Sequence, residues 1–163
     1  MKLLFAATFL AVCAAQATAQ HLSPDQVKQY LAGAGMGYAK AAELNHFPGP
    51  MHVLELADKL GLSEQQRAAT ERLMQAHKAE ARAIGEQLVE SERELEALFR
   101  SGRVDEAALA RAVRTAAALE GEYRLSHLET HRRMRAVLTS EQVKRYDELR
   151  GYAGEKGHQQ RKH

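Results

Sequence analysis

Two long stretches without proline, joined by a short break at residues 101–103, constrain the fold of this chain most strongly. Residues 63–100 carry apolar or small side chains at steps of three and four, and residues 105–138 continue the same spacing. This period places the apolar side chains on one face of an α-helix, where they must be buried against another element. Because a short connection returns a helix alongside its predecessor, the pattern predicts an all-α fold built on a long antiparallel helical hairpin.

The chain contains three similar helix starts, in the segments HLSPDQ, GLSEQQ and VLTSEQ. In each segment a Ser or Thr stands three residues before a Gln, which is the spacing of a capping box. The hydroxyl accepts from the Gln backbone amide, and the Gln side chain accepts from the amide of the cap residue. Helices are therefore predicted to begin after Ser23, Ser63 and Thr139. Another short helix is expected over residues 51–60, after a turn at residues 45–50.

The first 19 residues combine one Lys, an apolar run and a small-residue ending, which predicts a cleaved secretory signal peptide over residues 1–19. Residues 20–49 are interpreted as an N-terminal helix with a leader containing Gly and Pro, residues 50–152 as the main helical domain, and residues 153–163 as a disordered tail. The only cysteine, Cys13, lies in the predicted signal peptide, so no disulfide and no thiolate metal site are expected in the mature chain. No later segment is long and apolar enough to span a bilayer.

The charge balance argues against a nucleic-acid partner. Of the 23 Lys and Arg residues, only Lys2 lies in the predicted signal peptide, which leaves 22 basic and 21 acidic side chains and a net charge of +1 with neutral histidines. The two signs are intermixed along the predicted helices rather than gathered in one basic patch. The chain has no nucleophile and base signature and no phosphate-binding glycine loop, so it is not expected to be an enzyme.

The apolar composition predicts a homodimer. Aromatic residues make up 6% of the chain, tryptophan is absent, and alanine supplies much of the apolar content. A single thin layer of such helices would bury little apolar surface, and a second copy would supply the missing burial.

Histidines are the side chains best suited to carry chemistry. His127 and His131 are four residues apart and Met134 is three further, so all three lie on one helix face. His77 is as far from Gly102 as His127 is, so a hairpin folded at this glycine sets the two histidines opposite each other. Zn, Cu, Ni and Co ions favour imidazole, and a thioether favours Cu(I). The candidate metal ligands are His52, His77, His127, His131 and Met134, with Glu55 one turn beyond the first of them.

The segments LSEQQ and LTSEQ resemble the two LTxxQ motifs of the Spy/CpxP family of periplasmic proteins, which includes ZraP-like zinc-binding members and CnrX-like heavy-metal sensors. The resemblance covers residues 50–150, and residues 33–63 resemble the leader of the sensor relatives. It implies a periplasmic location and a four-helix, hairpin-based fold that dimerises into a cradle. CnrX-like sensors bind metal through several histidines, a glutamate and a methionine, with one histidine and methionine four apart, whereas His131 and Met134 are three apart here.

Two functions remain open from the sequence. In the first, a dimeric cradle holds unfolded or misfolded periplasmic proteins weakly and without nucleotide, as a Spy/CpxP-like stress-response chaperone. In the second, a Zn, Cu, Ni or Co ion binds the candidate ligands, and the protein is a periplasmic sensor or buffer with a membrane-bound signalling partner. The plainer alternative for the histidines is that they are hydrogen-bonded residues of the helical core.

Overall fold

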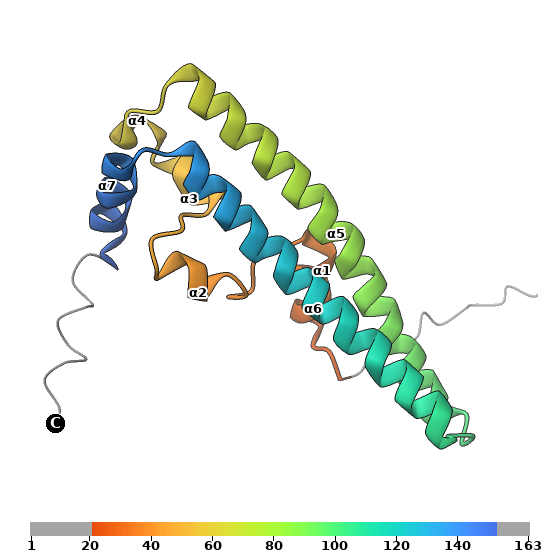
Figure 1. Ribbon diagram of the computed structural model, residues 1–163. Helices are drawn as coiled ribbons and strands as arrows, with labels where there is room; N and C mark the ends of the chain where they lie inside the picture. Colours follow the sequence, from red (N-terminus) through yellow and green to blue (C-terminus); the bar gives the residue numbers. More distant parts are fainter. Residues whose placement is uncertain (1–20, 153–163) are drawn as a thin grey trace, which may run out of the picture.

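The computed structural model describes residues 21–152. Within this range the chain forms helices and no strand, and Figure 1 shows two long helices side by side, with shorter helices near one end and along the middle. The elements are α1 (Pro24–Ala32), α2 (Lys40–Glu43), α3 (Pro50–Glu55), α4 (Ala57–Leu60), α5 (Glu64–Arg100), α6 (Glu106–Val137) and α7 (Ser140–Arg150). The predicted signal peptide and the predicted tail lie outside the described residues.

Helices α5 and α6 form the predicted antiparallel hairpin. The connection turns at Gly102, whose φ of +66° favours glycine. The predicted apolar stripes face each other, because Ala81 and Leu88 of α5 and Ala116 and Tyr123 of α6 are all buried. The prediction of an all-α hairpin with short flanking helices is therefore confirmed. Among the described residues, none of the helices has the combined length and apolar character needed to cross a membrane.

All three predicted capping boxes are present. Ser23, Ser63 and Thr139 each accept from the backbone amide three residues later, and the Gln at that position accepts from the amide of the cap. Each box occupies otherwise unpaired amides of a first helical turn, which is why α1, α5 and α7 begin where the sequence predicts.

The Gln residues of the second and third boxes also bind each other. The Gln66 amide nitrogen donates to the Gln142 side-chain oxygen at 2.8 Å, and the Gln142 nitrogen donates back at 3.0 Å. The Gln66 nitrogen also donates to the Val137 carbonyl at 3.0 Å, at the end of α6. One amide pair therefore joins the starts of α5 and α7 to the end of α6, and the repeated motif is a tertiary link as well as a local cap.

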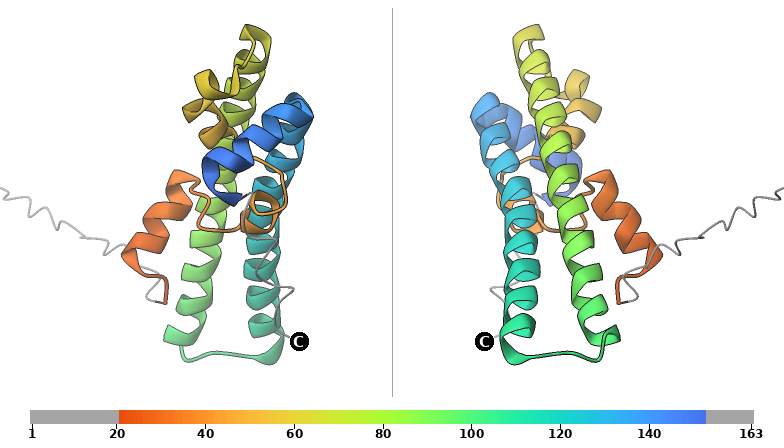
Figure 2. Two further views of the ribbon diagram at one scale, coloured as in Figure 1. Left: turned by 90° about the vertical axis from the view of Figure 1, so that its left-hand side faces the viewer. Right: turned by 90° about the vertical axis from the view of Figure 1, so that its right-hand side faces the viewer.

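Two hydrophobic clusters hold the short helices to the hairpin. The first lies near the starts of α5 and α7 and contains Val53, Leu60, Met134, Leu138, Val143 and Tyr146. The second lies midway along the hairpin and contains Tyr30, Ala81, Leu88, Val89 and Tyr123. Figure 2 shows α1 alongside the middle of α5, and α3 and α7 near the end away from the connection.

The predicted single helix over residues 51–60 is two short helices, α3 and α4. They are separated at Leu56, where the backbone has φ −102° and ψ 10°. Val53 and Leu60, on either side of this bend, both enter the first hydrophobic cluster. Tertiary packing thus breaks a helix that the local sequence alone would continue.

Candidate metal centre

A cleft of about 830 Å³ opens between the hairpin and the segment that precedes it. One wall is the glycine-containing segment of residues 32–37 together with α2 and α3, and the other is formed by the facing sides of α5 and α6. Four predicted ligands line this cleft, namely His52, His77, His127 and His131. The structure therefore brings all the predicted histidines to one cavity, although they come from three different helices.

His77 and His127 lie face to edge across the hairpin. Their ring centroids are 4.5 Å apart and their planes are inclined at 85°. His127 is only 3% exposed, whereas His77 is partly exposed. This is the pairing that equal distance from Gly102 predicts for an antiparallel hairpin.

Backbone carbonyls select the tautomers of two of these histidines. His127 Nδ1 lies 2.8 Å from the carbonyl of Tyr123, and His131 Nδ1 lies 2.8 Å from the carbonyl of Phe47. A carbonyl oxygen can only accept, so Nδ1 carries the proton in both neutral rings. In each ring the unprotonated lone pair, which is the one that can bind a metal, then lies on Nε2.

The Nε2 atom of His127 is buried and has no hydrogen-bond partner among the described residues. The carbonyl of Ala34 lies close enough to the ring to oppose the lowering of the His127 pKa, but its hydrogen bond is with the Tyr123 hydroxyl, at 2.7 Å. Buried polar atoms are normally paired, and an unpaired one calls for an explanation such as a bound ion. His127 lines the cleft beside His77, and its unpaired Nε2 atom is the feature that most clearly distinguishes the cleft from an ordinary core.

Glu43 of α2 organises the opposite side of the cleft and was missed in the sequence. His52 Nδ1 lies 3.4 Å from Glu43 Oε1, and His131 Nδ1 lies 3.6 Å from Oε2. Tyr146 donates its hydroxyl to Glu43 Oε1, and the Nε atom of Arg150 lies 3.7 Å from the same oxygen. Nothing in the spacing of Glu43 relates it to these residues, because only the folding of the leader over the hairpin brings them together.

Gly49 allows His131 to approach the leader. A Cβ atom at position 49 would lie 2.8 Å from His131 Cε1 and 2.9 Å from Nε2, closer than side chains normally pack. The predicted turn at residues 45–50 therefore also makes room for a candidate ligand.

Two other sequence candidates lie apart from the cleft. Met134 is fully buried in the first hydrophobic cluster and is not among the residues that line the cleft. Glu55 is exposed and is likewise absent from the lining. Met134 shares a helix face with His131, but that face passes under α3 and α7 at Met134, where apolar side chains surround it.

In the described part of the chain, no three His, Asp or Glu side chains are already arranged to hold one ion together. The four histidines share the cleft but do not converge on one point. Binding of an ion by three of them would therefore require side-chain rotation within the cleft.

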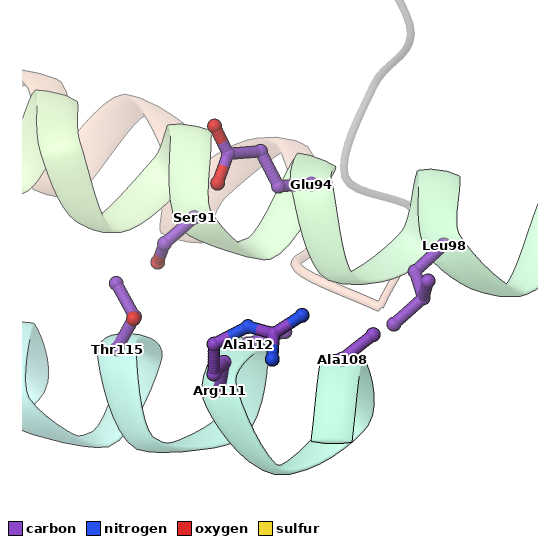
Figure 3. A pocket seen from close by; sticks show the side chains of 7 residues that line it. All are labelled: Ser91, Glu94, Leu98, Ala108, Arg111, Ala112 and Thr115. Carbon is purple, nitrogen blue, oxygen red and sulfur yellow. The ribbon is translucent and has the colours of Figure 1, made fainter. Parts of the chain in front are cut away.

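A second hollow, of about 270 Å³, lies between α5 and α6 toward the connection. Figure 3 shows the side chains of Ser91, Glu94, Leu98, Ala108, Arg111, Ala112 and Thr115 around it. Its lining has no histidine, one carboxylate and one arginine, so its donor set does not suit a transition metal.

Burial keeps two of the cleft histidines neutral. Desolvation, with smaller contributions from the neighbouring charges of His127 and His131, lowers the pKa of His77 from its ordinary 6.5 to about 4. Desolvation also lowers the pKa of His127, although its hydrogen bond to the Tyr123 carbonyl opposes the shift. Neutral imidazole is the form that binds metal, so the fold holds these side chains ready for a ligand near neutral pH.

The metal-free protein is therefore expected to lose stability as the pH falls from about 6.5 toward 4. In this interval the unfolded chain protonates His77 while the folded chain does not. We expect a loss of about 1 to 2 kcal/mol from this group after allowance for partial solvent screening. Urea unfolding at several pH values measures it, and His77→Gln should flatten the profile whereas His21→Gln, on an exposed side chain, should not. An unchanged profile for His77→Gln would contradict the assignment.

A comparison with protein-family models matches residues 50–150 to the model described as LTXXQ motif family protein. The chain belongs to the LTXXQ motif family. Its signature is that of the Spy/CpxP proteins, which are periplasmic, and the family resemblance seen in the sequence is confirmed. Among curated proteins and solved structures, none matches the chain.

The LTXXQ match includes both glutamines of the amide pair and all four cleft histidines. Glu43 and the glycine-containing wall at residues 32–37 precede the matched region. The cleft thus combines the hairpin and α3, which lie within the match, with a covering segment that precedes it.

Proposed function

We propose that this protein binds a transition metal ion in the histidine cleft and acts in the periplasm as a metal sensor or buffer. The observation that carries the proposal is the buried, unpaired Nε2 atom of His127 beside His77. Metal-binding histidines almost always donate their other ring N–H to a carboxylate, carbonyl or water, which fixes the ring and its tautomer. His127 and His131 both have this support from backbone carbonyls.

The donor set fits Zn, Cu, Ni or Co. Neutral imidazoles are good ligands for these ions, and the mature chain is expected to have no competing thiolate. His77, His127 and His131 would hold the ion, with His52 and Glu43 at the side formed by the leader. Such an ion would provide an electrostatic and covalent link between the hairpin and the segment that covers it.

This link suggests how binding would be reported. Suppose that the ion binds more tightly when the short helices cover the hairpin than when they are detached from it. The ion then shifts the population toward the covered state, and the size of the shift is set by the difference between the two affinities. Glu43 lies in α2 and His52 in α3, whereas the other ligands lie in α5 and α6, so the position of the two short helices on the hairpin would change with occupancy. A membrane-bound signalling partner that contacts the leader would then distinguish the two states.

Calorimetric titration of the mature chain with Zn(II), Ni(II), Co(II) and Cu(II) tests the proposal. His127→Ala should weaken binding by about tenfold or more, which is the usual scale even for loss of a supporting partner around a metal site. His21→Ala is the matched control, because His21 is exposed and pairs with Glu92 outside the cleft. If His127→Ala and His131→Ala leave affinity and stoichiometry unchanged while deletion after residue 154 abolishes binding, the ion binds the tail and the proposal is wrong.

A chaperone-like function is the second candidate, and the exposed apolar side chains of the hairpin favour it. Phe99, Val113 and Leu125 are 57%, 47% and 56% exposed among many charged residues. Unfolded or misfolded periplasmic proteins are the partners that such a surface would hold. Suppression of client aggregation, measured with and without metal, separates this role from metal binding alone. The predicted homodimer belongs to the same hypothesis, and light scattering at micromolar concentration tests it.

A further inference from the structure

Three methionines line the same cleft as the four histidines. Met36 lies in the segment after α1, Met51 in α3 and Met74 in α5, and all three contribute to the cavity wall. The whole chain has five methionines, of which Met1 belongs to the predicted signal peptide and Met134 to the hydrophobic core. The cleft therefore collects all the methionines of the described residues except the one that fills the core.

Met36 packs at the edge of the second hydrophobic cluster, whereas Met51 and Met74 belong to neither cluster. Met51 is 49% exposed, and Met36 and Met74 are partly exposed, whereas Met134 is fully buried. Core packing therefore accounts for Met36 in part but does not explain why Met51 and Met74 also line the cleft.

The backbone at Met36 adds an independent observation. Met36 has φ +47°, in the left-handed region that residues with a side chain rarely adopt. The next residue, Gly37, also has a positive φ, of 82°, but Met36 adopts this region with a side chain attached. Strained residues of this kind cluster at ligand sites, where the surrounding structure holds them in place.

The charges around the cleft favour an ion of low charge. Lys40, Lys78 and Arg150 line it, and Glu43 is its one carboxylate. Glu43 already accepts the Tyr146 hydroxyl and lies near the guanidinium of Arg150. Repulsion from three cationic side chains grows with the charge of a bound ion, so a monovalent ion loses less than a divalent one.

We propose that the cleft is a soft-metal site selective for Cu(I), bound by the thioethers of Met36, Met51 and Met74 together with the imidazoles of His77 and His127. This inference rests on the proposed function, and it names the class of ion. Thioether sulfur prefers Cu(I) to Zn(II), Ni(II) or Co(II), and neutral imidazole adds a donor that carries no charge. The ion enters and leaves as Cu(I), so the protein needs no oxidant or reductant.

The test uses Ag(I), a monovalent and redox-inert substitute for Cu(I), and then Cu(I) itself under anaerobic conditions. Mature protein labelled with ¹³C at the methionine methyl groups should show shifts of the Met36, Met51 and Met74 signals on addition of Ag(I), while the Met134 signal stays in place. Replacing the three cleft methionines together by Leu should weaken binding of both monovalent ions by at least about tenfold. Met134→Leu, a substitution of similar volume, is the matched control.

Parallel titration with Zn(II) separates this inference from the proposed function. Binding of Zn(II) that depends on His127, combined with unshifted cleft methyl signals and equal Ag(I) affinity in the triple variant, would refute the Cu(I) site and leave metal binding by the histidines intact. Absence of binding by every ion would refute both. A circular dichroism spectrum like that of the wild type shows that the triple variant remains folded.

Discussion

Gly85→Ala is expected to destabilise the protein by about 3 kcal/mol and to release α1 from the hairpin. A Cβ atom at this position would lie 2.2 Å from the carbonyl oxygen of Tyr30 and 2.7 Å from its carbonyl carbon. Both contacts are with backbone atoms, which cannot rotate away as a flexible side chain would. The loss would also expose Tyr30 and Tyr123, which lie edge to face at 5.1 Å in the second hydrophobic cluster.

Gly121→Ala is the matched control in the other long helix. Nothing lies within 4 Å of a Cβ atom built at Gly121. The same substitution should therefore stabilise the protein by about 1 kcal/mol through helix propensity alone. Urea unfolding of both variants measures the two effects, and Trp introduced at position 31 would report separation of α1. Similar changes for the two glycines would contradict the close packing of α1 on α5.

Loss of the hydrogen-bonded pair of Gln66 and Gln142 side chains is expected to cause the second largest decrease in stability. Gln66→Ala removes the side-chain oxygen that accepts from the Ser63 backbone amide. It also removes the side-chain nitrogen that donates to the Val137 carbonyl and to the Gln142 side-chain oxygen. We expect a cost of about 2 kcal/mol for this variant and a similar cost for Gln142→Ala. The stability lost in the double variant should be about 1 kcal/mol smaller than the sum of the losses in the two single variants, because each single change already breaks the shared hydrogen bonds.

Gln26→Ala provides the comparison with a cap that has no such link. Gln26 closes its box with Ser23 on an exposed surface. Its removal should cost about 1 kcal/mol or less and should be additive with Gln66→Ala. Chemical unfolding of the three single and two double variants measures each loss of stability and both coupling energies. Strict additivity between positions 66 and 142 would show that the two motifs are only local helix caps.

The local features of the chain could be predicted because their causes lie close together in the sequence. A capping box needs residues three apart, and an apolar stripe needs only the helical period. The pairing of His77 with His127 follows from one further fact, the position of the tight turn at Gly102. The hairpin, the starts of three helices and two facing histidines were therefore accessible without a structure.

The composition of the cleft depends on the path of the leader, which no local pattern encodes. Residues 32–52 cross the hairpin and bring Glu43 and two of the methionines to the histidines, whereas Met134 turns into the core. The lowered pKa of His77 likewise arises from burial by this segment and its neighbours, because desolvation depends on everything packed around a group. The sequence by itself thus determined the long hairpin, the starts of the three capped helices and the helix face that carries the histidines. Only the tertiary structure decided which side chains share a cavity with them, because such contacts join residues far apart in the chain.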